Sequence, residues 1–155
     1  MTEYASGLIL FDIIDEQSYI GRITINNREK RNAISNSMCI GFSNLLDDCL
    51  KNYKTLRVII LTGHGQISFC SGSDLSEEDA KDGHQILLNL CQKLRQFPLP
   101  IISKIHGYCL GGGLALAMST DLRIASQNAL FSIPVVKSGL PCPQGIICQK
   151  FVAQF

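Results

Sequence analysis

Two glycine-containing stretches of the sequence could place bare backbone N–H groups beside a reacting oxygen. The stretch "SGSDL" covers residues 71–75 and "LGGGLALA" covers residues 110–117, and each follows a buried, apolar stretch. The first amides of a helix have no acceptor inside the helix, so they can bind an anion or a developing oxyanion. Two amides directed at one oxygen would be a strong catalytic device, because loss of one such donor can lower a rate by about 10²–10³.

The same glycines also fit a purely structural role, in which a missing side chain lets a helix pack closely on a sheet. Other glycine-dependent sites are not supported, because the sequence contains no GxxxxGK[ST], GxGxxG or GxSxG. A phosphate-cradling loop, a dinucleotide fold and a serine-nucleophile hydrolase are therefore disfavoured. Oxyanion binding and close packing both remain open at this point.

The elements that must position these glycines are predicted from hydrophobic periodicity. Residues 7–14 and 19–26 are rich in apolar and β-branched residues around the turn-like "DEQS", which predicts a β-hairpin. Ser35 or Asn36 is expected to cap a helix over residues 37–52. Alternation of further strands and helices predicts an α/β fold with right-handed crossovers. The expected strands cover 56–63, 100–107 and 121–126, and the expected helices 83–97 and 114–119.

Composition limits the class of partner. The 155 residues predict one domain, and a net charge of +1 with 46% hydrophobic residues gives no reason to expect nucleic acid or membrane as a partner. The seven cysteines form no CxxC pair, which favours reduced core thiols in the cytoplasm over a disulfide frame or a metal site. No signal peptide is expected, and no apolar run reaches the roughly 18 residues of a membrane span.

Four blocks of the sequence together resemble the enoyl-CoA hydratase/isomerase, or crotonase, superfamily. They are "REKRNAIS" at 28–35, "RVIILTGHGQISFCSGSDL" at 57–75, "IISKIHGYCLGGGLALAMSTDLRIAS" at 101–126 and "LFSIPVVKSGLPC" at 130–142. The resemblance implies a ClpP/crotonase-like α/β spiral of β-β-α turns that binds an acyl-coenzyme A thioester. Coenzyme A is then part of the substrate, so no separate cofactor and no metal are expected, and the family's assembly is a homotrimer or a dimer of trimers.

The resemblance also implies roles for particular residues. The backbone N–H groups of Ser73 and Gly112 would form the oxyanion hole for the thioester carbonyl, which agrees with the pair of amides inferred from the glycines. The cations of the "KRNA" segment would lie near the phosphates of coenzyme A. The residues expected along coenzyme A are Lys30, Arg31, Ala33, Ser71, Asp74 and Leu75.

The sequence departs from the family's hydratases at both catalytic glutamates. Ala115 and Val135 stand where the resemblance places the two carboxylates that activate water. Neither side chain can transfer a proton, and a general acid or base contributes about 10²–10⁴ in rate. Efficient hydration is therefore not expected. The hypotheses are a crotonase-type enzyme acting through an enolate, a non-catalytic acyl-CoA-binding or assembly protein, and a decarboxylase or thioesterase.

Other polar groups near the glycines have structural explanations beside functional ones. His64 and His106 could move a proton at neutral pH, although a structural role is favoured for each. Tyr108 and Cys109 could face the acyl pocket, while Cys70 is expected to pack. The acidic run at 77–79 is expected at a helix start, and Asp121 is expected to be structural.

Length is the second departure. Family members extend well beyond the position that matches Phe155, into helices that close the acyl pocket and mediate trimer contacts. Residues 1–155 are accordingly expected to form a single crotonase-like core domain that is incomplete at its C-terminal end, with the C-terminal helical part missing.

Overall fold

A six-stranded sheet organises the fold of this computed structural model, which describes residues 1–15, 17, 19–74 and 80–134. Its strands lie in the order β1-β2-β3-β4-β6-β8. Pairing is antiparallel from β1 to β3 and parallel from β3 to β8. The strands are β1 (Thr2–Tyr4), β2 (Ile9–Ile13), β3 (Ile20–Ile25), β4 (Val58–Gly63), β6 (Ile101–Ile105) and β8 (Leu122–Ala125).

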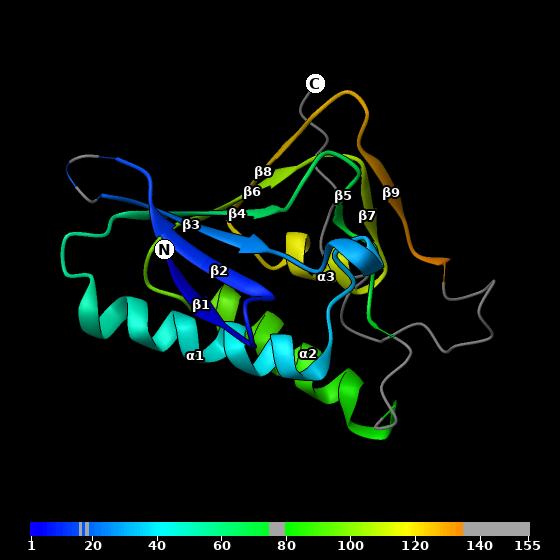
Figure 1. Ribbon diagram of the computed structural model, residues 1–155, viewed down its shortest axis with the longest axis horizontal. Coiled ribbons are helices and arrows are strands. Elements are labelled where there is room, and N and C mark those ends of the chain that lie inside the picture. The colour runs from blue at the N-terminus through cyan, green and yellow to red at the C-terminus, as the bar shows by residue number, and fades with distance from the viewer. Residues whose placement is uncertain (16, 18, 75–79, 135–155) are drawn as a thin grey trace.

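A second, three-stranded parallel sheet is built from β5 (Ser68–Cys70), β7 (Tyr108–Leu110) and β9 (Leu130–Ser132). Figure 1 shows its strands running steeply across the direction of the first sheet. Each of its strands follows a strand of the first sheet, so the chain repeats the pairs β4-β5, β6-β7 and β8-β9. Gly107 makes one of these corners, where φ is +56° and a Cβ would overlap the carbonyl oxygen of Ile67.

Two long helices cover one face of the six-stranded sheet (Figure 1), and a short helix follows β7. Helix α1 (Asn36–Asn52) begins at the cap Ser35, whose Oγ accepts from the N–H of Met38 at 3.2 Å. Helix α2 (Ala80–Arg95) is joined to α1 by Lys93, whose Nζ lies 2.8 Å from the carboxylate of Asp47. The remaining helices are α3 (Gly112–Met118) and the 3₁₀ turn η1 (Arg28–Lys30).

The core lies between the sheets and the helices. The central strands alternate buried and less buried residues, as a strand with one covered face must. The apolar face of α1 packs on the same cluster. Its largest fully buried side chains include Phe11, Phe42, Phe69, Ile23, Leu45 and Leu61.

The predicted hairpin, the helix capped by Ser35 and the alternating α/β order are confirmed. The second sheet was not predicted, because its strands have three residues each and their partners are distant in the sequence. The strand expected at 100–107 corresponds to β6, and β7 begins beyond it, after the Gly107 corner. In the part of the chain that the structure describes, no helix is both long and apolar enough to cross a membrane.

Candidate functional site

The three consecutive glycines serve three different purposes. Gly111 precedes α3 with a φ of +47°, a conformation that L side chains rarely adopt. A Cβ on Gly112 would lie 2.8 Å from Ser73 Oγ and 3.2 Å from Ser73 N, and one on Gly113 would overlap the carbonyl oxygen of Cys70. The start of α3 therefore lies directly against residues 70–73, so the two glycine-containing stretches are adjacent in space.

The orientation of the Ser73 amide follows from its neighbours. Ile34 N donates to Gly72 O at 2.8 Å, and Asp74 N donates to Ile34 O at 2.8 Å. A trans peptide is planar, with its C=O and N–H on opposite sides. The bond on Gly72 O therefore directs the N–H of Ser73 away from Ile34.

Both predicted oxyanion donors are available to an acceptor. Within the described residues, neither Ser73 N–H nor Gly112 N–H donates a hydrogen bond. The two segments are adjacent, because a Cβ on Gly72 would lie 3.9 Å from Gly112 N. Ser73 is exposed and Gly112 is half-buried, so a ligand can reach both amides, and two fixed donors on adjoining segments could stabilise one oxygen atom.

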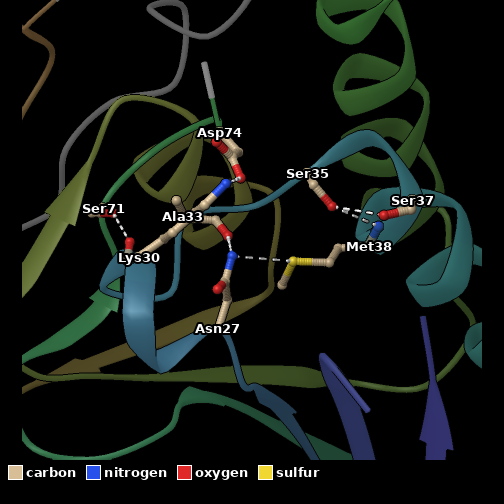
Figure 2. Close-up of polar contacts among 8 residues, drawn as sticks. All are labelled: Asn27, Lys30, Ala33, Ser35, Ser37, Met38, Ser71 and Asp74. Atoms are coloured by element: carbon tan, nitrogen blue, oxygen red, sulfur yellow. Dashed lines mark hydrogen bonds and ion pairs between the residues drawn. The ribbon is translucent and has the colours of Figure 1, made fainter. Parts of the chain in front are cut away.

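The turn at residues 27–33 lies beside this site (Figure 2). Arg31 and Asn32 have φ values of +53° and +58°, a region in which asparagine is favoured among residues with side chains. Asn32 is buried, and its Nδ2 donates to the carbonyls of His64 and Ser68. Asn27 Nδ2 holds the other end of the turn by donating to Ala33 O at 2.9 Å. Sequence reasoning missed Asn32, although an asparagine within "KRNA" is itself a signal for a left-handed turn.

Hydrogen bonds and an ion pair fasten this turn to residues 71–74. Ser71 Oγ donates to Lys30 O at 3.0 Å, and Ser71 N donates to Arg31 O at 3.2 Å. Lys30 Nζ lies 2.6 Å from Asp74 Oδ2, as Figure 2 shows. Of the residues predicted along coenzyme A, Ser71 and Asp74 thus both contact Lys30, while Arg31 is exposed and Ala33 is buried. Leu75 lies outside the described residues.

No carboxylate occupies the first of the two glutamate positions. Ala115 is buried within α3, and its N–H donates to Gly111 O at 3.0 Å. Its methyl group cannot accept or donate a proton. The second position, Val135, lies outside the described residues, as does the acidic run at 77–79.

The two histidines follow neighbouring parallel strands. His64 follows β4, and its N–H donates to Ile25 O at 2.8 Å, while His106 follows β6 and accepts from Phe69 N at 2.9 Å. Burial, helped by the charge of Lys104, lowers the pKa of His106. The lowered pKa favours the neutral form of His106 over the charged form, which fits the structural role favoured for it.

The cysteines beside the site are poor nucleophiles. Cys70 and Cys109 are fully buried neighbours on β5 and β7, and burial raises the pKa of each thiol to about 12. A buried thiol at that pKa is almost entirely protonated at neutral pH, which supports a packing role.

Tyr108 and Asp121 belong to the frame of the site. Tyr108 is partly exposed on β7, and its carbonyl accepts from Ser68 Oγ at 3.1 Å. Asp121 Oδ2 accepts from Ile101 N at 2.8 Å, which supports its predicted structural role. Among the described residues, no group of three or more His, Cys, Asp or Glu side chains could hold a metal ion.

The fold is that of a crotonase-type protein, and sequence comparison identifies the family. Residues 15–152 match the enoyl-CoA hydratase/isomerase family, so the chain belongs to that family. Its similarity to solved structures includes the enoyl-CoA hydratase of Bacillus anthracis, with a TM-score of 0.77 at 27% identity. That match covers 87% of this chain and 54% of the other, and it confirms the predicted crotonase fold.

Two curated relatives give the same picture. The short-chain-enoyl-CoA hydratase of Clostridium acetobutylicum is 34% identical over 136 residues, which cover 83% of this chain and 51% of the relative. The mitochondrial enoyl-CoA hydratase domain-containing protein 3 of Xenopus laevis is 34% identical over 139 residues, which cover 84% of this chain and 46% of the relative. The chain spans about half the length of the curated relatives it matches.

Proposed function

We propose that the protein binds an acyl-coenzyme A thioester and stabilises negative charge on the thioester carbonyl oxygen. The observation that carries this proposal is the pair of amides on adjoining segments, Ser73 N–H and Gly112 N–H, neither of which has an acceptor among the described residues. An enolate or a tetrahedral intermediate places its charge on that oxygen, where two fixed donors stabilise it more than water does. Membership of the enoyl-CoA hydratase/isomerase family supports the choice of a thioester.

Coenzyme A would lie along the 27–33 turn. Arg31 is exposed and forms no ion pair with any described residue, so its guanidinium is available to the phosphates. The small side chain of Ala33 is buried, and Ser71 and Asp74 belong to the adjoining segment, while Leu75 stays a prediction from the sequence. Ser71 and Asp74 fasten their segment to the 27–33 turn, since both bond to Lys30.

The buried methyl group of Ala115 favours reactions that need charge stabilisation but no carboxylate at that position. Decarboxylation and thioester hydrolysis are reactions of this kind, and we place both ahead of hydration. The same observation favours a second candidate function, binding of acyl-CoA without turnover.

The test is to incubate the protein with crotonyl-CoA and to measure three quantities. Calorimetry gives the affinity, absorbance follows the conjugated double bond, and chromatography detects released coenzyme A. We expect binding with little loss of the double bond, and released coenzyme A would identify a thioesterase. Failure to bind would contradict the proposal, while fast hydration would show that another group replaces the missing carboxylates.

Three further expectations belong to this proposal. Coenzyme A enters with the substrate, so activity should need no added cofactor or metal. A cytoplasmic location and a homotrimer or a dimer of trimers stay predictions from the sequence. Fractionation of cells and sedimentation of the purified chain would test them.

A further inference from the structure

We propose that Lys30 and Asp74 form a positioning pair that orients the amide of Ser73, and that Lys30 does not contact the phosphates of coenzyme A. This inference rests on the function proposed above. It replaces the role expected for Lys30 from the sequence. The reason is the place of Asp74 in the chain, directly after the residue whose N–H is the proposed oxyanion donor.

Two peptide planes determine where Ser73 can point. The plane that joins Gly72 to Ser73 is held by the bond from Ile34 N to Gly72 O, and the next plane by the bond from Asp74 N to Ile34 O. These bonds fix the segment against residue 34 on one side only. The Asp74 side chain adds a second anchor, because its Oδ2 lies 2.6 Å from Lys30 Nζ.

The turn that carries Lys30 is fastened to the same segment. The Lys30 carbonyl accepts from Ser71 Oγ at 3.0 Å, and the Arg31 carbonyl accepts from Ser71 N at 3.2 Å. The turn therefore contacts the segment on both sides of Ser73, at residue 71 and at residue 74. In Figure 2 the side chain of Lys30 reaches across from the turn to Asp74.

Burial distinguishes the two members of the pair. The side chain of Asp74 is only 9% exposed, whereas that of Lys30 is 49% exposed. A carboxylate that is nearly buried requires a charged partner, since an unpaired buried charge is strongly unfavourable. Removing the ammonium would therefore take from Asp74 a cationic partner at 2.6 Å and weaken one anchor of the segment that presents Ser73 N–H.

A Lys30 that positions Asp74 and a Lys30 that binds phosphates predict different effects of a Lys30 substitution on the affinity for two ligands. Acetoacetyl-CoA carries the thioester oxygen, whereas free coenzyme A carries the same phosphates without it. We would measure both dissociation constants by calorimetry for the whole chain and for Lys30→Met, which keeps an unbranched apolar stem. If Lys30 is a positioning residue, Lys30→Met should weaken the binding of acetoacetyl-CoA by about tenfold. This is less than the effect of losing one oxyanion donor completely, because the donor is displaced and not removed. The affinity for coenzyme A should stay within about twofold, since no phosphate contact is lost.

Matched variants complete the test. Lys30→Arg keeps the ion pair and should restore the preference for the thioester, and Lys51→Met, an exposed position on α1, should leave both affinities unchanged. If Lys30→Met fails to fold, Asp74→Asn is the second variant, because it removes the nearly buried charge itself. It should also lower the preference for acetoacetyl-CoA over coenzyme A. Equal weakening of both ligands by Lys30→Met would overturn the proposal and assign Lys30 to the phosphates.

Failure of the proposed function would look different. In that case the unmodified chain would bind acetoacetyl-CoA no better than coenzyme A, before any variant is compared. A third outcome would separate the two proposals. The unmodified chain would prefer the thioester, and Gly112→Ala would remove that preference while Lys30→Met would keep it. This result would support the oxyanion site and contradict the positioning role of Lys30 and Asp74.

Discussion

Ser73 Oγ lies so close to Gly112 that a methyl group on that glycine would be 2.8 Å from it. This contact joins the segment after β5 to the start of α3, and both segments contribute a proposed oxyanion donor. The same added methyl group would also lie 3.2 Å from Ser73 N and 3.0 Å from Leu87 Cδ2. The space beside Gly112 is thus too small for any side chain unless the donor itself moves.

Gly112→Ala should consequently damage the site more than the fold. The side chains of Ser73 and Leu87 can rotate away from the methyl group, but Ser73 N, 3.2 Å from it, is backbone, so the donor itself must shift. We expect the rate of any thioester reaction, or the preference for acetoacetyl-CoA over coenzyme A, to fall by about 10²–10³. Gly83→Ala, whose new Cβ would meet only the flexible side chain of Asn36, is the matched control for binding. Unchanged ligand preference in Gly112→Ala would exclude this amide as a donor.

Gly113→Ala should instead damage the fold. Its Cβ would overlap the carbonyl oxygen of Cys70, which is backbone and cannot rotate away as a side chain does. We expect a loss of about 1–3 kcal/mol or more in the free energy of unfolding, the usual range for overpacking. Urea denaturation of the two neighbouring variants would check this contrast. Equal stability of Gly113→Ala and the unmodified chain would contradict the close approach of α3 to β5.

Ser35→Ala tests the start of α1. Ser35 Oγ accepts from Met38 N at 3.2 Å, so its removal leaves a helix amide without a partner. A loss of about 1 kcal/mol in the free energy of unfolding is expected. Ser37→Ala removes only the side-chain contact with Ser35 Oγ and should cost less. Urea denaturation at constant pH measures both, and a larger effect of Ser37→Ala would show that Ser35 is not the cap.

His106 should make the protein sensitive to mild acid. Burial lowers its pKa in the folded state, and its Nε2 has no partner in the described part of the chain. As pH falls below the unfolded value of about 6.5, the unfolded chain binds the proton first, so stability decreases. His106→Gln should lose less stability than the unmodified chain between about pH 7 and about pH 5. His84→Gln, at an exposed position of α2, is the control. An unchanged pH dependence in His106→Gln would contradict the lowered pKa.

The buried thiols should resist alkylation. Burial raises the pKa of Cys49, Cys70 and Cys109 to about 12, so almost no thiolate is present at neutral pH. We expect these cysteines to react with iodoacetamide only when the chain unfolds. Peptide mapping by mass spectrometry after labelling in native buffer and in urea separates them from Cys142 and Cys148, which lie outside the described residues. Fast native labelling of Cys70 would indicate an accessible thiol at the site.

The helices and the longer strands were predictable from the sequence, while the strands of three residues were not. The helix after Ser35 and the hairpin strands carry enough residues for their apolar spacing to be recognised. Strands β5, β7 and β9 have three residues each, and they exist because parallel partners distant in the sequence complete their hydrogen bonds. Their prediction would have required knowledge of the tertiary pairing.

The candidate site divides in the same way. Residue types at "SGSDL" and "LGGGLALA" were sufficient to propose two backbone donors, because the family pattern and helix-start chemistry agree on Ser73 and Gly112. The assignment of Lys30 to phosphates came from residue type and family position alone. In the structure its ammonium lies 2.6 Å from the nearly buried carboxylate of Asp74, a contact that the sequence did not predict.

The sequence by itself determined the family, the order of the helices and of the longer strands, and the absence of a carboxylate at position 115, since these depend on residue identity and local spacing. Only the tertiary structure decided which groups meet. The direction of Ser73 N–H depends on the bond between Ile34 and Gly72, and the partner of Lys30 depends on the packing of the 27–33 turn against residues 71–74. Contacts between segments so far apart arise from the packing of the whole chain, which no local pattern of residues encodes.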